Sequence, residues 1–277
     1  MRESIQGTFH FHSTYSHDGR SSLGEIASTL KRRGFSFCIM TEHFEDFDAP
    51  KFGSYVQECG EVSRSSEFLL IPGMEVDLSG LHTIVFPVSN YEEIASISSE
   101  GKNNQRHLFK VLAHPSKYSS AAVAQHLDRY AIDGIELWNQ QADGSHIPPM
   151  RFLETLKSRP RRNDYRYFFG CDIHNVRLTV ANTISVSTAI PPTVGAISQA
   201  LVQGAFVSRN LSTGIEYRNG VDPGDFDLWL RTLLERSYVR GRVLRTVRNS
   251  LKFFYRRLPP NVQHSLNDVK NFVRNKV

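Results

Sequence analysis

Short apolar runs, each followed within a few residues by His, Asp or Glu, recur along the chain. Five such runs have the length and the β-forming composition of buried strands. They cover residues 5–9, 35–41, 68–71, 108–113 and 165–171. Further runs at 81–88, 132–138, 182–189 and 204–208 also predict strands. Segments with helical spacing lie between many of them, at 22–34, about 54–63, 91–99, 119–130, 148–158 and 193–202.

The alternation of strands and helices predicts an α/β fold. Intervals that can hold a helix favour parallel strands, and parallel strands with outer helices close into a barrel. About seven strands fit the pattern. The polar residues follow the strand ends, so we expect one functional site where the C-terminal ends of the strands meet. Residues 44–53 are expected to be a loop.

Composition indicates a folded protein without a membrane span. Of the 277 residues, 40% are hydrophobic and 11% aromatic, which is enough for a packed core. No apolar run reaches 18 residues, and the N-terminus lacks the apolar segment of a signal peptide. Three cysteines without metal-type pairing favour reduced thiols. We therefore expect a cytoplasmic protein.

Charge divides the chain into two parts. Residues 1–224 hold 21 Lys and Arg against 24 Asp and Glu, whereas residues 225–277 hold 12 against 4. The pattern predicts a domain over 1–224 and a basic amphipathic helical extension over 225–277. Three interpretations of the extension stay open. Its apolar stripe packs on the domain, or it lies on an anionic membrane surface, or it grips the phosphates of a nucleic acid.

The polar residues at the strand ends are typical metal ligands. His10 and His12 stand two apart, a spacing that puts both side chains on one face of a strand. Similar side chains follow the later strands. They are Asp18, His43, Glu75, His114, Asp172 and His174. Imidazole and carboxylate groups suit zinc, manganese or iron.

The motifs together resemble those of the PHP family, the polymerase and histidinol phosphatase family. The matching stretches are His10-Phe-His12-Ser-Thr-Tyr-Ser-His-Asp18-Gly, Thr41-Glu-His43, Gly73-Met-Glu75, Ala113-His114-Pro115 and Gly170-Cys-Asp172-Ile-His174. They occur in the family's order over residues 5–210. Two weaker likenesses are Gly134-Ile-Glu-Leu-Trp-Asn139 and Gly204-Ala-Phe-Val-Ser208.

The resemblance implies a distorted (β/α)7 TIM-like barrel with a cluster of two or three divalent metal ions at its mouth. The first metal would take His10, His12, Glu75 and Asp172. Glu75 would bridge to a second metal, held by His114 and by His82, although a surface or core role for His82 is an alternative. The third metal would take Asp18, His43 and His174.

One position departs from the family, whose second motif usually reads Thr-Asp-His. Here Glu42 stands in place of the Asp, and its extra methylene moves the carboxylate by ~1.5 Å. The family's Asp usually supports the ligands, so we expect an altered support and not a lost site.

The implied reaction is hydrolysis of a phosphate ester, most readily a small phosphomonoester, by a metal-activated water. Asp172, His174 and His17 are the candidate catalytic residues, and His17 could donate a proton to the leaving oxygen or be an ordinary loop histidine. The candidate phosphate contacts, each otherwise a solvated side chain, are Lys117, Arg177 and Arg20. Alternative functions are a phosphodiesterase or exonuclease acting on oligonucleotides, and a non-catalytic metal-binding adaptor.

Overall fold

The computed structural model describes residues 2–100, 108–146, 149, 152, 156, 165–189 and 191–219. Its strands are β1 (Arg2–Phe11), β2 (Phe37–Met40), β3 (Glu42–His43), β4 (Leu69–Ile71), β5 (Met74–Leu78), β6 (Leu81–Phe86), β7 (Phe109–Leu112), β8 (Gly134–Asn139), β9 (Arg166–Gly170), β10 (Asn182–Ala189), β11 (Phe206–Asn210) and β12 (Glu216–Arg218). Its helices are α1 (Leu23–Arg32), α2 (Ala49–Ser66), α3 (Tyr91–Glu100), α4 (Ser120–Arg129), α5 (Gln140–Asp143) and α7 (Val194–Val202). Two single turns of 3-10 helix are η1 (Phe44–Asp46) and η2 (Pro115–Lys117).

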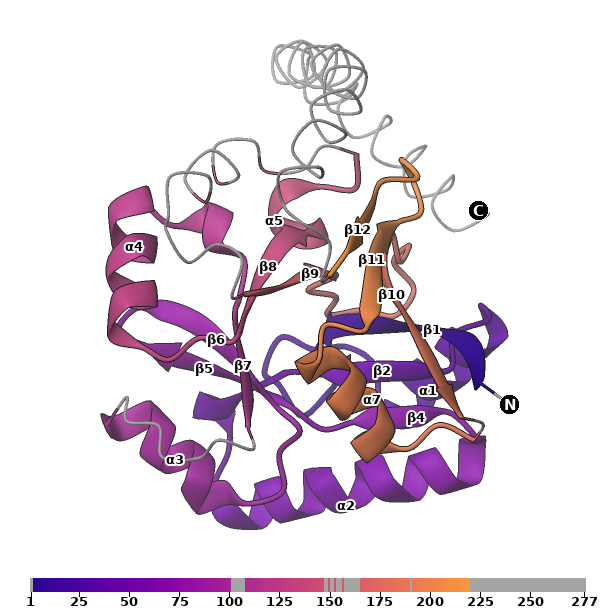
Figure 1. The fold of residues 1–277 in the computed structure, drawn as a ribbon. Helices are drawn as coiled ribbons and strands as arrows, with labels where there is room; N and C mark the ends of the chain where they lie inside the picture. The colour runs from indigo at the N-terminus through magenta and orange to yellow at the C-terminus, as the bar shows by residue number, and fades with distance from the viewer. Residues whose placement is uncertain are drawn as a thin grey trace, which may run out of the picture. The chain divides into compact units, whose positions relative to one another are not determined.

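The strands form two six-stranded sheets (Figure 1). The first has the order β12-β11-β10-β1-β2-β4, and the second has the order β3-β5-β6-β7-β8-β9. Parallel pairing joins β1 to β2, β2 to β4, β3 to β5, β7 to β8 and β8 to β9. The other described pairs are antiparallel. The fold is therefore mixed α/β.

The wholly parallel barrel predicted from the alternation of strands and helices is wrong in its strand directions. The segment between β5 and β6 is only a two-residue turn, Ser79–Gly80, which can join antiparallel strands and cannot hold a helix. The β10–β11 pair is also antiparallel although α7 intervenes. The expected loop at 44–53 is shorter, because α2 begins at Ala49 with Asp48 as its N-cap.

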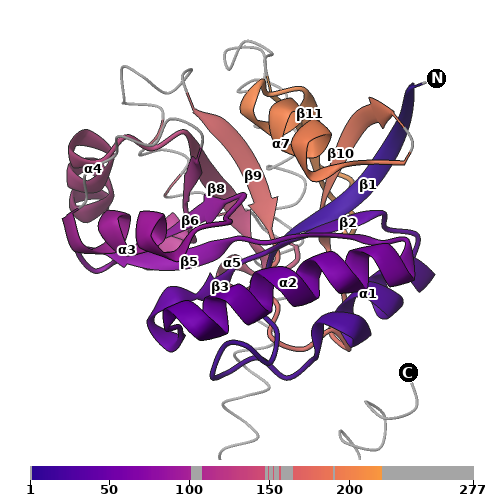
Figure 2. The same ribbon diagram turned by 90° about the horizontal axis from the view of Figure 1, so that it is seen from below.

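Helices cover the outer faces of the sheets. α2 packs on α1 and on β4, α3 packs on β5, and α7 packs on β10. Figure 2 shows α1 and α2 running side by side along the first sheet. The α1 helix begins with the predicted cap at Ser22, which forms a reciprocal capping box with Glu25. No described helix combines the length and the hydrophobicity needed to cross a membrane.

An apolar core lies between the two sheets. It contains residues from both of them, including Phe9 of β1, Phe86 of β6 and Phe168 of β9. The Phe9 ring centroid lies 4.9 Å from that of Phe168 and 5.8 Å from that of Phe86. Interlocked aromatic rings of this kind hold the strand ends at fixed separations, which is what a multi-residue site requires.

Backbone hydrogen bonds also link the sheets beyond the paired strands. The chain that follows β9 returns to β1, where Cys171 N–H donates to the carbonyl of Phe9 at 2.8 Å and His12 N–H donates to that of Ile173 at 2.9 Å. On the other side, β2 and β3 are separated by Thr41 alone, and each pairs within a different sheet. The strand ends that carry the polar motifs are thereby brought together.

The predicted helix at 148–158 lies almost wholly outside the described residues, as does the basic extension at 225–277.

Candidate metal centre

The buried carboxylate of Glu75 lies among five imidazole rings. Its Oε1 atom is 2.9 Å from His82 Nδ1, 2.9 Å from His114 Nε2 and 3.6 Å from His10 Nε2. Its Oε2 atom is 3.2 Å from His43 Nδ1 and 3.6 Å from His12 Nε2. The two oxygens therefore face different sets of rings, which is the arrangement of a carboxylate that can bridge two ions.

Strand register explains how two of these rings reach Glu75. In the β5–β6 hairpin, His82 stands opposite Asp77, so it lies diagonally across from Glu75 on the same face. In the parallel β3–β5 pair, His43 stands directly beside Glu75. The His82 ring therefore lies beside Glu75 with 33% of its side chain exposed, and its role as a ligand stays a prediction.

Asp172 forms a second buried carboxylate beside the same rings. Its Oδ1 atom is 3.5 Å from His10 Nε2 and 3.6 Å from His12 Nε2. Groups of donor atoms within 4.8 Å of one another include His10, His12 and Glu75, and also His10, His114 and Asp172. The resemblance implied His10, His12, Glu75 and Asp172 for the first metal, whereas the second of these groups joins His114, implied for the second metal, to His10 and Asp172.

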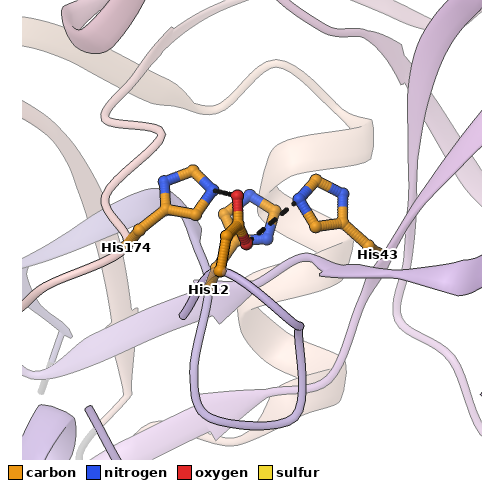
Figure 3. Close-up of side chains that lie close together, drawn as sticks. His12, His43 and His174 are labelled. Atoms are coloured by element: carbon orange, nitrogen blue, oxygen red, sulfur yellow. Dashed lines mark ion pairs between the residues drawn. The ribbon is translucent and has the colours of Figure 1, made fainter. Parts of the chain in front are cut away.

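A more open group lies at the edge of the cluster. Asp18 is 3.4 Å from His43 Nε2 through Oδ1 and 3.0 Å from His174 Nε2 through Oδ2. Figure 3 shows the rings of His174 and His43 facing each other from opposite sides, with His12 between them and these ion pairs dashed. The His12 ring is stacked on that of His174 at 4.2 Å between centroids. The Asp18 side chain is 43% exposed, whereas that of His10 is wholly buried, so the cluster opens to solvent at Asp18.

Several buried ring nitrogens of the cluster lack a hydrogen-bond partner within the described protein. They are His10 Nε2, His12 Nε2, His43 Nδ1 and His114 Nδ1. Buried polar atoms are almost always satisfied, so four such atoms in one cluster indicate a missing partner. Divalent metal ions fit, because His10 Nε2, His12 Nε2 and His43 Nδ1 each have a carboxylate oxygen of Glu75 beside them.

The charges of the cluster also favour cations. Burial alone would raise the pKa values of Glu75 and Asp172, but neighbouring histidines, His10 foremost, hold both well below their usual range. Both carboxylates are therefore ionised. Burial lowers the pKa of His12 to about 4, which leaves this ring neutral and able to ligate. Burial would lower the pKa of His43 too, but Glu75 and Asp18 raise it to about 9.

Backbone strain is concentrated in the cluster. Positive φ angles at non-glycine residues are uncommon, and three of the five in the described chain belong to His10 (φ 72°), His114 (φ 29°) and Asp172 (φ 54°). His10 also interrupts the β1–β2 register between Phe9 and Phe11. The predicted simple alternation of His10 and His12 on one strand face is therefore replaced by an irregular strand end. Such conformations persist where surrounding contacts enforce them.

Glu42, the residue that departs from the family motif, is fully buried beneath the first loop. Both of its carboxylate oxygens accept from Ser13 N–H at 3.0 Å, and Oε2 also accepts from Ser16 Oγ at 2.6 Å. Ser16 Oγ in turn accepts from His43 N–H at 3.0 Å. Glu42 thus ties the loop between His12 and Asp18 to the strand that carries His43.

The candidate substrate-contacting residues differ in position. Lys117 Nζ lies 3.3 Å from Asp172 Oδ2, at the edge of the cluster. The exposed ring of His17 lies with Nδ1 2.9 Å from Asp46 Oδ2, and its centroid is 5.3 Å from that of the stacked His43 ring. Arg20 and Arg177 are exposed, and among the described residues no side-chain contact joins either to the cluster.

Sequence reasoning missed two carboxylates at the site. Glu136 of β8 contacts His10 Nδ1 at 3.0 Å, and Asp46 contacts His17. A signal for Glu136 existed, because it lies within the 134–139 stretch that resembles a family strand. Nothing in the local sequence points to Asp46, whose position depends on the turn η1.

The family model described as the PHP domain matches residues 8–158. Among curated proteins, none matches the chain significantly.

Among solved structures, three similar ones share little sequence with this chain. A Bifidobacterium adolescentis protein, provisionally described as a metal-dependent phosphoesterase, is 13% identical, with 61% of this chain and 87% of that chain covered and a TM-score of 0.41. PsfC from Pseudomonas syringae is 12% identical, with 87% of this chain and 99% of PsfC covered and a TM-score of 0.48. Endonuclease Q in complex with a 27-mer duplex containing an abasic lesion is 16% identical, with 72% of this chain and 56% of Endonuclease Q covered and a TM-score of 0.46.

Proposed function

The chain belongs to the PHP domain family, and from this premise and the geometry of the cluster we propose that it is a metal-dependent phosphoesterase that hydrolyses a small phosphomonoester. The observation that carries the proposal is Glu75 among five imidazoles, with buried ring nitrogens that have no protein partner. Such a donor set binds divalent cations, and cations are what a phosphate requires.

Three groups of residues would hold the ions. His10, His12, Glu75 and Asp172 would hold the first, Glu75, His82 and His114 the second, and Asp18, His43 and His174 the third. Zinc, manganese and iron all suit these ligands. When bound, such ions polarise phosphate oxygens and lower the pKa of water toward neutrality.

The protein's own residues would bind and orient the ester. The open side of the cluster at Asp18 would be the entrance, since the Asp18 side chain is 43% exposed and His174 lies beside it. Lys117 Nζ, held beside Asp172, would place a cation against a phosphate oxygen. His17, oriented by Asp46, is placed to give a proton to the leaving oxygen. Arg20 and Arg177 would contact only more distant parts of a substrate.

The proposal also covers the barrel, the domain boundary and the cellular location. The return of residues 171–173 to β1 and the continuity of β2 with β3 support a distorted seven-stranded barrel built from both sheets. Residues 1–224 would form the catalytic domain and residues 225–277 a separate basic extension. The three described cysteines are buried free thiols, in keeping with a cytoplasmic location.

A second candidate is hydrolysis of phosphodiesters in oligonucleotides. The basic extension favours it, because 12 Lys and Arg against 4 Asp and Glu would attract a nucleic acid backbone. A non-catalytic adaptor is less well supported, since a domain that had lost catalysis would be expected to have lost ligands. Here each position of the three groups holds a His, Asp or Glu that can ligate a metal.

The deciding experiment compares ester classes on one preparation. The full-length protein is stripped with a chelator, reloaded with zinc, manganese or iron, and assayed on p-nitrophenyl phosphate, bis-p-nitrophenyl phosphate and labelled single strands. We expect metal-dependent turnover of the monoester. Turnover of the diester or strand alone would replace the proposal with its second candidate, and metal binding without any turnover would favour the adaptor.

Matched variants connect the activity to the cluster. Asp172→Asn removes a buried ligand charge and should abolish turnover. Asp133→Asn is the control, because Asp133 precedes β8 at the end opposite Asn139 and an amide can still accept from Lys110 N–H as the carboxylate does at 2.9 Å. The control should retain turnover.

A further inference from the structure

Glu136 is a buried carboxylate that touches two candidate ligands without belonging to any donor group. It is 1% exposed on β8. Its Oε1 atom lies 3.0 Å from His10 Nδ1. Its Oε2 atom accepts from the backbone N–H of His114 at 2.6 Å and from Asn139 Nδ2 at 2.9 Å. No Lys or Arg among the described residues forms an ion pair with it.

The contact with His10 fixes which ring nitrogen faces the cluster. An ionised carboxylate can only accept, so Nδ1 must carry the proton. When a metal replaces the second proton of the ring, Nε2 is the lone-pair donor, and it is this atom that is buried without a hydrogen-bond partner, 3.6 Å from Glu75 and 3.5 Å from Asp172. The opposite tautomer would point a proton into the cluster and oppose a cation there.

The contact with His114 acts on the backbone. His114 has a φ of 29°, a costly conformation for a residue with a side chain, and its N–H is the group that Glu136 binds. His10, at φ 72°, is held through its ring by the other oxygen of the same carboxylate. Glu136 therefore joins two strained strand ends that carry ligands.

The neighbouring strand leaves space for this carboxylate. A Cβ atom at Gly170 of β9 would overlap the Glu136 side chain, so the glycine just before Cys171-Asp172 is required by Glu136 and not by a turn. Both β8, which carries Glu136, and β9, which carries Gly170, therefore contribute to the placement of this carboxylate.

We propose that Glu136 is the positioning residue of the metal centre, selecting the Nε2-donor form of His10 and fixing the backbone of His114. The inference rests on the proposed function only in that the cluster binds metal. Removing Glu136 would then lower metal affinity by about 10–100-fold, the usual effect of losing a carboxylate behind a ligating histidine.

Glu136→Gln is the informative variant. If its oxygen accepts from His114 N–H and Asn139, its NH₂ group faces His10 Nδ1 and selects the wrong tautomer. Asp143→Asn is the matched control, because Asp143 accepts from the backbone of Asn139 and from Ser116 Oγ, nearby groups that are not ligands. Zinc affinity of each stripped protein is measured by competition with a chromophoric chelator. We expect a loss of about 10–100-fold in Glu136→Gln alone, and equal affinities of Glu136→Gln and wild type would overturn the proposal.

A second measurement uses only the wild-type protein, so it can be made even if Glu136→Gln does not fold. In ¹H–¹⁵N spectra of the zinc-loaded wild-type protein, His10 should carry its proton on Nδ1, and a proton on Nε2 would overturn the assignment. Zinc binding without turnover of any ester would remove the proposed function and leave this inference intact.

Discussion

At the scale of single residues, the centre depends on histidines whose proton affinities differ widely. His12 is neutral, with its pKa lowered by burial to about 4, whereas burial is outweighed at His43 by Glu75 and Asp18, which raise its pKa to about 9. Burial is likewise outweighed at His10, whose pKa is raised well above its ordinary value by Glu136, Asp172 and Glu75. In the metal-free protein, the rings of His10 and His43 are therefore protonated and carry positive charge next to the buried carboxylates.

These pKa shifts predict how metal affinity depends on pH. A ring whose pKa is about 9 is protonated at neutral pH, and a metal must displace that proton. Apparent zinc affinity should therefore rise by about tenfold per pH unit for each proton displaced, and the contribution of His43 should level off near pH 9. Chelator competition between pH 6 and pH 9 measures it. An affinity that is flat over this range would contradict the expectation.

Glu42 gives a prediction about stability. Glu42→Ala leaves the buried Ser13 N–H and the Ser16 hydroxyl without their acceptor, and each unsatisfied group costs about 1–3 kcal/mol. Glu42→Asp, the family's usual residue, is shorter by ~1.5 Å and should lose less. Urea unfolding of the metal-free variants measures the loss. Equal stability of Glu42→Ala and wild type would show that the loop does not depend on this carboxylate.

At the scale of elements, buried polar contacts join strands and helices that the hydrophobic pattern alone would leave separate. Asn182 of β10 donates to the carbonyls of Trp138 and Gly170 and accepts from Asn210, so it links the first sheet to β8 and β9. His126 of α4 contacts Thr83 Oγ1 of β6 at 3.1 Å. Networks of this kind fix one arrangement among several that the apolar core would allow.

His126 makes the packing of α4 on β6 sensitive to acid. Burial lowers its pKa to about 4, below the ordinary 6.5 expected in the unfolded chain. Between these values the unfolded chain binds more protons, so stability is present above pH 6.5 and is lost as the pH falls toward 4. The loss attributable to His126 is about 1–3 kcal/mol.

The measurement is urea unfolding of the metal-free protein from pH 7 to pH 4, compared with His126→Gln. The glutamine side chain can keep a hydrogen bond to Thr83 but does not titrate, so the pH dependence of its unfolding free energy should be shallower. Parallel curves for the two proteins would assign the acid sensitivity to other groups.

At the scale of the whole molecule, the sequence indicated which side chains gather at the strand ends better than it indicated the framework that holds them. Residues such as His10, Glu75 and Asp172 follow apolar runs, and this signal is local. The antiparallel β5–β6 hairpin, the positive φ of His114 and the link from Glu136 to His10 depend on contacts between distant segments. A pattern of apolar and polar positions carries strand length and face, but neither strand direction nor long-range partners.

The location of the ligands predicts the effect of removing the basic extension. The residues of the four donor groups run from His10 to His174, and the described strands end at Arg218. A protein shortened to residues 1–224 should therefore keep the zinc affinity and the monoester turnover of the full chain. Binding to anionic vesicles or to single strands, if the full chain shows either, should be lost in the shortened protein because 12 of the basic residues are removed. Vesicle flotation and filter binding at two salt concentrations measure this, with turnover assayed on the same samples. Loss of turnover together with the extension would mean that residues 225–277 contribute to the substrate site, which the geometry of the metal centre does not require.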